Sequence, residues 1–225
     1  MGLGRLSLVP GAKGPTAFER DLGNGIVIKL LRRRHARSLY ALTDRNRERL
    51  RPWLPWVDRV HGITGTLNFI EQGLSQSNNG AGFQSGIWVD GNLSGVVGTH
   101  RIDWENRSTG LGYWIDGAQE GRGIVTLCVG AMLDYVFGSL HLHRVEIRAA
   151  TDNQRSRAVP ERLGFRLEGV IRQDHRVGNV WQDLAVYGIL RSEWRGLPGS
   201  LVVGEPGGSA GARDRGVAGG QQPAP

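Results

Sequence analysis

The amino-acid sequence predicts a mixed α/β domain, and two features of its pattern indicate this. Runs with strand-like alternation, bounded by Gly, Asn and Asp turns, occur along most of the 225 residues. Segments of helical periodicity interrupt them, and one of these, between Tyr113 and His143, joins two strands as a crossover does. A chain of this length has room for one main domain with a substantial core.

The elements of the N-terminal half follow from local patterns. They are a strand at Ile26–Leu31 after a Gly-Asn-Gly turn, a helix at Arg34–Leu50, a proline-broken aromatic loop at Arg51–Asp58 and a helix at Thr64–Ser75. Thr64 is the expected N-cap of that last helix, because its hydroxyl can accept from a free backbone N–H.

The C-terminal half is predicted to begin with a β-meander. The elements in order are strands at Phe83–Asp90, Leu93–Ile102 and Gly110–Ile115, a helix at Ile124–Phe137, a strand at His143–Ala150, a helix at Asn153–Leu163 and a hairpin of Phe165–Arg176 and Val180–Leu190. If Ser156 is near the N-cap of the short helix, Pro160 falls in its first turn, where the missing N–H removes no intrahelical bond.

Composition divides the chain into three parts. Residues 1–20 are expected to be a flexible leader and residues 196–225, rich in Gly, Ala and Pro, a disordered tail, so the domain spans residues 21–195. No apolar run is long enough to cross a bilayer, and the N-terminus lacks a convincing signal peptide. The single cysteine, Cys128, excludes an internal disulfide and a Cys-based metal cluster. A cytoplasmic protein without a membrane partner or a bound metal is the simplest interpretation.

The net charge of +7 is concentrated near the N-terminus. Residues 1–60 contain 13 Lys and Arg against 5 Asp and Glu, and the rest contains 15 against 16. This excess could attract an anionic partner such as ribosomal RNA or a polyanionic cofactor. Aromatic residues are not interleaved with the basic ones as on nucleic-acid surfaces. We therefore favour a solvated basic surface over nucleic acid as a direct partner.

The stretch from Leu111 to Val136 has the pattern of a strand, a glycine turn and a helix. A helix that opens at Gly121-Arg122-Gly123 presents unpaired N–H groups and the positive end of its dipole, which together bind phosphate oxygens. The third glycine of a dinucleotide-binding fingerprint and the Gly-Lys-Ser/Thr ending of a P-loop are both missing. The sequence therefore predicts an anion site that belongs to neither of those classes.

The segment Glu120–Thr126 resembles the acyl-CoA pyrophosphate loop of the Gcn5-related N-acetyltransferases (GNAT), whose pattern is Gln/Arg-x-x-Gly-x-Gly/Ala. Gly123 matches the central glycine, whereas Glu120 replaces Gln or Arg and Val125 replaces Gly or Ala. The backbone N–H groups remain available in spite of these departures. The resemblance implies that acetyl-CoA is bound by Gly121, Arg122, Gly123, Ile124, Val125 and Thr126, with side-chain contacts from Arg122 and Thr126.

Four more segments resemble the RimJ/RimL-type branch of this family, which acetylates the N-terminal amines of ribosomal proteins or related amines. They are Leu50–Asp58, Gly112–Asp116, His143–Ala149 and Asn153–Arg172, and the likeness runs in unbroken order from Gly25 to Trp194. It implies a single GNAT-like domain with a central, mostly antiparallel, twisted sheet that splays at the acyl-CoA site.

The resemblance also implies roles for individual residues around the cofactor. In this family the strand before the loop pairs its backbone with the pantetheine arm, and a β-bulge there would leave an N–H, of Trp114 or Ile115, to polarise the thioester carbonyl. Asn153-x-x-Ser156 matches the Asn-x-x-Ser pattern of the branch. It implies a pantetheine contact from Asn153 and, from Ser156, an acid or hydrogen-bond donor near the sulfur. Both residues could also simply cap a helix.

The base and the acceptor site are less constrained. An α-amine has a pKa of about 8, so a weak base or a water chain is sufficient. His175 stands two residues after Gln173, where the branch often has glutamate, and a free histidine with a pKa of about 6.5 suits proton removal near neutrality. It could equally be an exposed hairpin residue. Trp53 and Trp56 are candidates for the acceptor-site wall, and one of the two is expected to be a core residue instead.

Three functions are compatible with the sequence. The favoured one is acetyl-CoA-dependent acetylation of a protein N-terminus by direct attack in a ternary complex. The second is acetylation of a small amine such as an antibiotic, polyamine or amino acid. The departures at Glu120 and Val125 leave a third, a non-catalytic acyl-CoA-sensing module. Residues Leu50–Ser75 and the last hairpin should select the acceptor, and a homodimer is compatible with each function.

Overall fold

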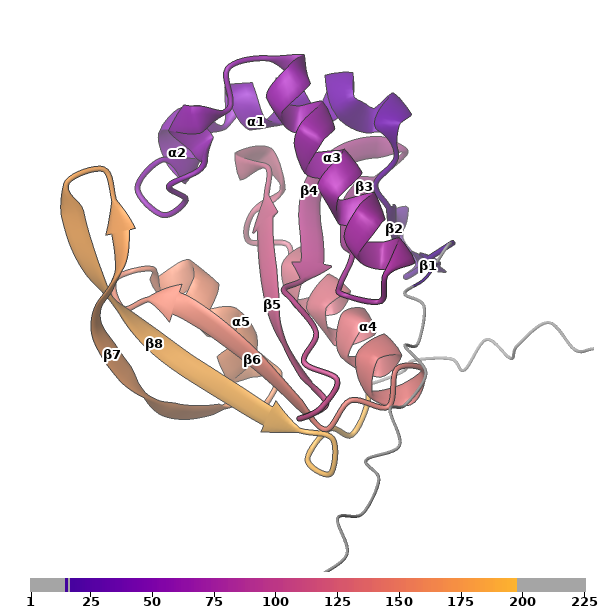
Figure 1. The fold of residues 1–225 in the computed structure, drawn as a ribbon, viewed down its shortest axis with the longest axis vertical. Helices are drawn as coiled ribbons and strands as arrows, with labels where there is room; N and C mark the ends of the chain where they lie inside the picture. Colours follow the sequence, from indigo (N-terminus) through magenta and orange to yellow (C-terminus); the bar gives the residue numbers. More distant parts are fainter. Residues whose placement is uncertain (1–14, 16, 198–225) are drawn as a thin grey trace, which may run out of the picture.

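Eight strands form one sheet in the order β1-β2-β3-β4-β5-β6-β8-β7, in a computed structural model that describes residue 15 and residues 17–197 (Figure 1). The strands are β1 (Glu19–Asp21), β2 (Ile26–Leu30), β3 (Gln84–Val89), β4 (Asn92–Thr99), β5 (Ser108–Ile115), β6 (Arg144–Ala150), β7 (Arg166–Val177) and β8 (Val180–Leu190). Neighbouring strands are antiparallel except β5 and β6, which are parallel. The predicted mixed and mostly antiparallel sheet is therefore confirmed.

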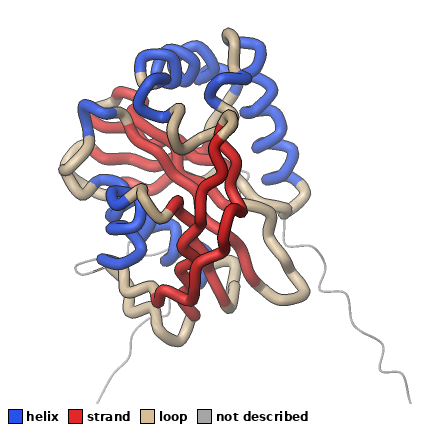
Figure 2. Tube along the Cα trace, turned by 90° about the vertical axis from the view of Figure 1, so that its left-hand side faces the viewer, coloured by secondary structure: helices blue, strands red, loops and turns tan. Residues whose placement is uncertain are grey.

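Helices lie on both faces of this sheet (Figure 2). They are α1 (Ala36–Arg45), α2 (Arg47–Leu50), α3 (Ile63–Asn78), α4 (Ile124–Gly138) and α5 (Gln154–Arg162), with 3-10 turns η1 (Arg33–His35), η2 (Val57–Arg59) and η3 (Gly117–Gln119). Within the described residues, no helix has both the length and the apolar character needed to span a bilayer.

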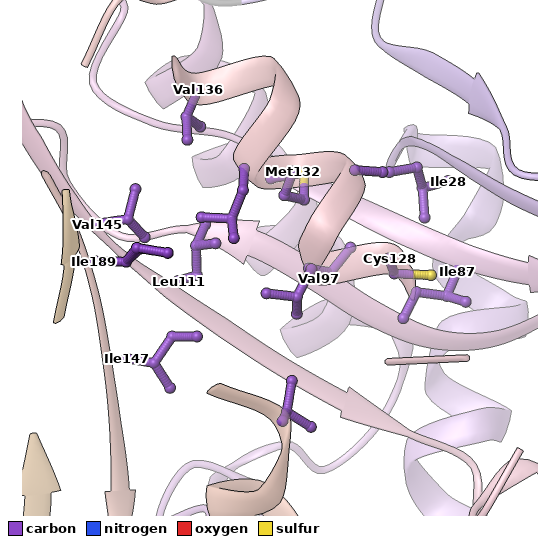
Figure 3. Close-up of a cluster of buried hydrophobic side chains, with 14 of the residues drawn as sticks. Ile28, Ile87, Val97, Leu111, Cys128, Met132, Val136, Val145, Ile147 and Ile189 are labelled. Carbon is purple, nitrogen blue, oxygen red and sulfur yellow. The ribbon is translucent and has the colours of Figure 1, made fainter. Parts of the chain in front are cut away.

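Two layers of buried side chains hold the helices to the sheet. Met132 and Cys128 of α4 pack on one face with Val97 of β4, as Figure 3 shows. The next residue back along β4, Val96, faces the opposite layer, where Ile70 of α3 joins it. This is the two-residue alternation of a strand buried on both faces. Strand β4 is thus the central support of the strand that follows it, β5.

The parallel pair β5–β6 separates soon after it forms. Only Ser108–Gly110 pairs with Arg144–Glu146, whereas β5 continues along β4 to Ile115 and β6 continues along β8 to Ala150. Figure 1 shows the two strands diverging towards α2. We call this divergence the splay. It confirms the predicted splayed sheet and leaves one edge of β5 without a partner strand beyond Gly110.

The domain begins earlier than predicted. Phe18 is 4% exposed, and its ring centroid lies 5.2 Å from that of Phe83 and 4.8 Å from that of Tyr135. Glu19–Asp21 then pairs with β2 as an edge strand. Assigning residues 18–20 to a flexible leader is therefore wrong, because Phe18 anchors them to the core. The rest of the predicted leader, residues 15 and 17 apart, and the predicted tail from residue 198 lie outside the described residues.

Three local predictions fail for physical reasons. The helix expected at Arg34–Leu50 is divided at Asn46, whose buried side chain bonds outside the helix. Helix α3 begins after Gly62 instead of at Thr64, and the N-cap φ of 113° suits glycine. Helix α5 begins at Gln154, so Pro160 lies in its second turn and does remove an intrahelical bond.

Candidate active site

The loop and helix start at Gly121–Thr126, here called the cradle, connect β5 to α4. Gly121 and Gly123 have φ of +75° and +74°, the left-handed region in which glycine meets no steric penalty. A Cβ on either glycine would meet nothing within 4 Å, so the space beside them is open. Among the described residues, no group accepts from the N–H groups of the first three residues of α4. The cradle therefore fits a phosphate or pyrophosphate group.

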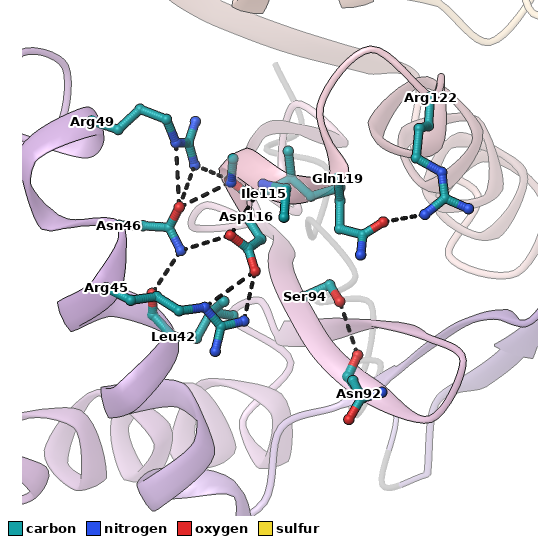
Figure 4. Close-up of polar contacts among 12 residues, drawn as sticks. Leu42, Arg45, Asn46, Arg49, Asn92, Ser94, Ile115, Asp116, Gln119 and Arg122 are labelled. Atoms are coloured by element: carbon teal, nitrogen blue, oxygen red, sulfur yellow. Dashed lines mark hydrogen bonds and ion pairs between the residues drawn. The ribbon is translucent and has the colours of Figure 1, made fainter.

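The side chains of the cradle contribute less than its backbone. Ile124 is buried in the core, and Val125 and Thr126 are half-buried. The guanidinium of Arg122 donates to the side chain of Gln119 (Figure 4). The predicted pyrophosphate contacts of the cradle therefore rest on its backbone N–H groups, while a phosphate contact from Arg122 stays a prediction.

Glu120, just before the cradle, is held between two arginines. Its carboxylate pairs with Arg49 of α2 and, at 2.5 Å, with Nη1 of Arg155 in the first turn of α5. Arg49 also donates to the carbonyl of Ile115. The departure from the family pattern at Glu120 therefore has a cationic partner on each side, and its negative charge is compensated.

The free edge of β5 directs alternate backbone groups into the splay. The N–H of Asp116 donates to Ser94 at 2.7 Å and the carbonyl of Gly110 accepts from His100 at 2.8 Å, so the residues between them alternate in pairing with β4. The alternation directs the N–H of Trp114 to β4 and the N–H groups of Tyr113 and Ile115 into the splay. The β4–β5 register is continuous from residue 111 to residue 115, so the predicted bulge is absent. Ile115 is thus better placed than Trp114 to polarise a thioester.

Trp114 packs in the layer that holds α1 to the sheet, and Trp56 lies beside it. The rings of Trp114 and Trp56 have centroids 6.3 Å apart. Trp53 and Trp56 are both half-buried. Neither is a fully buried core residue, so the expectation that one of them is a core residue is wrong.

Asn153 and Ser156 lie together at the start of α5. Asn153 is the N-cap, and its Oδ1 accepts from the N–H of Ser156 at 3.1 Å. The capping role is therefore present. It uses the carbonyl oxygen of Asn153 and leaves the Nδ2 group as the donor for a ligand. The hydroxyl of Ser156 lies 3.5 Å from the hydroxyl of Tyr113, which reaches across the splay from β5.

Pro160 explains why the Tyr113 hydroxyl bonds to the backbone of α5. In an α-helix, the carbonyl of Ser156 would accept from the N–H of residue 160, but proline has none. The hydroxyl of Tyr113 donates to that carbonyl at 2.9 Å instead. Burial raises the pKa of Tyr113 far above its ordinary value, against a smaller opposing effect of the bond to Ser156. Tyr113 is therefore a neutral donor that fixes the first turn of α5 to β5.

His175 connects the β7–β8 hairpin to the aromatic loop. A register shift in β7 precedes it, where Gln173 has a φ of 53° and donates its N–H to Asp183. Nε2 of His175 lies 2.9 Å from the carbonyl of Trp53, and a carbonyl can only accept, so Nε2 carries a hydrogen. In the neutral ring, Nδ1 is then the basic nitrogen. The role of His175 as base stays a prediction.

Sequence reasoning missed Tyr113, Arg49 and Arg155 as parts of this site. Arg155 follows Asn153 by two residues, in a turn that the Asn-x-x-Ser pattern already places near the cofactor, and this was an available signal. Arg49 pairs with a residue 71 positions away and had no local signal. For Tyr113 there was an indirect signal. A proline four residues after Ser156 leaves the Ser156 carbonyl without its helical donor, so another donor is needed.

The comparisons with known proteins agree with this geometry. A family model described as "Acetyltransferase (GNAT) domain" matches residues 26–166. The putative ribosomal N-acetyltransferase YdaF of Bacillus subtilis (strain 168) is 37% identical over 180 residues, which cover 80% of this chain and 98% of YdaF. The ribosomal-protein-serine acetyltransferase of Escherichia coli (strain K12) is 28% identical over 153 residues, 68% of this chain and 86% of that relative.

A solved structure agrees as well. The crystal structure of the microcin C7 self-immunity acetyltransferase MccE, in complex with acetyl-CoA and AMP, has a TM-score of 0.72 and 27% identity over 75% of this chain and 94% of MccE. Acetyl-CoA is the cofactor of this family, and the open cradle beside the splay fits its pyrophosphate. With a family model that matches more than half of its length, the chain belongs to the GNAT acetyltransferases.

Proposed function

We propose that this enzyme transfers the acetyl group of acetyl-CoA to the N-terminal α-amine of a protein, with a ribosomal protein as the first candidate. The observation that carries the proposal is the splay, because it joins the cradle to the aromatic loop at residues 51–58. A donor held on the cradle side and an amine arriving past the loop would meet at the free edge of β5. The relatives named as ribosomal acetyltransferases support a protein acceptor.

Acetyl-CoA supplies the activated acetyl group, and the chain supplies binding, orientation and protons. The N–H groups of the cradle hold the pyrophosphate, and Nδ2 of Asn153 donates to the pantetheine arm. The N–H of Ile115 donates to the thioester oxygen, where negative charge develops. The hydroxyl of Ser156 gives the leaving sulfur a proton or a hydrogen bond.

The acceptor amine enters on the opposite side. Trp53 and Trp56 flank its path, and Nδ1 of His175, or a water chain, takes the proton from the amine. A surface hollow of about 340 Å³ adjoins this path, between the aromatic loop and the tip of the β7–β8 hairpin at Arg176–Gly178. A polypeptide beyond its first residue would lie there. A cytoplasmic location, where ribosomal proteins are made, goes with this proposal.

An acceptor screen tests the proposed substrate. The full chain is incubated with acetyl-CoA and a panel of amines, and release of the free thiol is followed together with the mass of the acceptor. We expect acetylation of Ser- or Ala-starting peptides and none of the same peptides blocked at the N-terminus. Turnover with aminoglycosides or polyamines but with no peptide would contradict the proposal that the acceptor is a protein. In the same assay, an unchanged pH–rate profile in His175→Ala would argue against His175 as the base.

The cradle is tested by Gly123→Asp. The substitution forces a side chain into a left-handed backbone and adds a negative charge beside the phosphate site, so we expect acetyl-CoA affinity to fall at least about tenfold. Gly23→Asp is the matched control, because Gly23 has a φ of +78° with nothing within 4 Å and lies at the far edge of the sheet. Calorimetric titration with acetyl-CoA makes the comparison. Equal affinities in both variants would show that the cradle does not bind the phosphates of acetyl-CoA.

A further inference from the structure

The carboxylate of Glu120 is shared by two cations from opposite sides of the splay. Arg49 approaches from α2, next to the aromatic loop, and Arg155 approaches from α5, next to Asn153. The side chain of Glu120 is 25% exposed, whereas that of Arg155 is 80% exposed. Arg155 is therefore the cation of the three-residue cluster that is most accessible to an arriving anion.

The cluster of Glu120, Arg49 and Arg155 lies at the edge of the cradle. Glu120 directly precedes Gly121, and Arg155 crosses from the first turn of α5 to reach it at 2.5 Å. An anion bound by the N–H groups of the cradle would approach both the carboxylate of Glu120 and the guanidinium of Arg155. The carboxylate repels that anion and the guanidinium attracts it, so the two anions compete for one cation.

We propose that Glu120 is an internal counter-ion for Arg155, and that binding of acetyl-CoA exchanges the Glu120–Arg155 ion pair for an Arg155–phosphate contact. This rests on the proposed placement of acetyl-CoA in the cradle. Acetyl-CoA and the product CoA carry the same phosphates, so Glu120 weakens the binding of both and speeds release of the product. The carboxylate in place of Gln or Arg then sets cofactor affinity, while the pair with Arg49 keeps Glu120 in position throughout.

The test is calorimetric titration of the full chain with CoA, using Glu120→Gln. Glutamine keeps an oxygen that can accept from Arg49 but removes the competing charge. We expect CoA to bind about threefold to fivefold more tightly, the range of a partly exposed ion pair, and the gain to shrink at high salt. Arg155→Gln should weaken binding by a similar factor, and Glu120→Gln should gain less in that background than in the wild type.

Two control variants separate this effect from general charge and folding effects. Glu71→Gln removes a carboxylate that pairs with Arg33 away from the cradle. Arg162→Gln removes a cation from the last turn of α5. Both should leave CoA affinity unchanged. Unchanged or weaker binding in a folded Glu120→Gln variant overturns the counter-ion role. If Glu120→Gln gives that result while Gly123→Asp still weakens CoA binding, only the counter-ion role is overturned and the proposed function stands. If the wild type does not bind CoA at all, the proposed function falls with it.

Discussion

At the scale of single residues, helix α5 depends on a hydrogen-bond donor that another element supplies. Pro160 is buried and adds no donor, and Tyr113 supplies the missing one from a different element. The same tyrosine hydroxyl lies within 3.5 Å of the Ser156 hydroxyl. A backbone requirement of α5 therefore also brings a tyrosine beside the residue proposed to serve the leaving sulfur.

This arrangement predicts a specific coupling between Tyr113 and Pro160. Tyr113→Phe leaves the carbonyl of Ser156 without its donor and should lower the free energy of unfolding by about 1 kcal/mol. Pro160→Ala restores an N–H at the right position, so the double variant should recover most of that loss, beyond the sum of the single effects. Urea unfolding at neutral pH measures all four proteins. Strictly additive effects would show that the two residues do not share the Ser156 carbonyl.

At the scale of elements, Asn46 and Asp116 fix α1 and α2 to the loop before the cradle. The buried side chain of Asn46 donates to Asp116 at 3.1 Å and accepts from the N–H of Gly117 at 2.9 Å (Figure 4). Arg45 donates to the same aspartate at 2.6 Å. The break between the two helices is therefore the point at which they contact the end of β5.

That contact predicts a pH-dependent contribution to stability. Burial raises the pKa of Asp116, but the hydrogen bonds from Arg45 and Asn46 outweigh it, and the net pKa lies below the ordinary value. Ionised Asp116 therefore stabilises the fold above the unfolded-state pKa of about 4, and this contribution is lost as the pH falls through the lower folded value.

Asp116→Asn should accordingly cost about 1–2 kcal/mol at pH 7, and the difference from the wild type should shrink as the pH falls below about 4. Thermal unfolding across this range is the measurement, with Asp152→Asn, an exposed carboxylate, as the control. A difference that stays constant down to pH 3 would mean that the charge of Asp116 does not contribute.

The helices and strands also show which structural features local sequence can predict. The predicted strand Val180–Leu190 and the predicted start of α4 at Ile124 agree with the structure, because apolar periodicity and glycine turns are local signals. The break at Asn46 was not predictable, since the aspartate that accepts its hydrogen bond lies 70 residues away. The pairing of Arg49 with Glu120 was missed for the same reason, because these residues lie 71 positions apart. Strand β1 escaped because its three residues are exposed and carry no apolar alternation.

At the scale of the whole molecule, the sheet consists of two parts held by a short seam. Strands β1–β5 form one part and β6–β8 the other, and three residue pairs between β5 and β6 join them directly. Helix α4, Tyr113 and the Glu120–Arg155 pair add further connections across the splay. A cofactor that hydrogen-bonds to the cradle, to β5 and to Asn153 would bridge the same two parts.

Acetyl-CoA should therefore stabilise the molecule and protect one edge of one strand. At a hundred times its Kd, a ligand of the folded state adds about 2.7 kcal/mol, which for a domain of this size raises Tm by about 5–10 °C. Amide exchange, followed by NMR, should slow at Tyr113 and Ile115, whose N–H groups face the splay. It should change little at Trp114, which already pairs with β4. Gly123→Asp should show neither effect. Stabilisation with no added protection at Tyr113 or Ile115 would mean that the cofactor binds without pairing to β5.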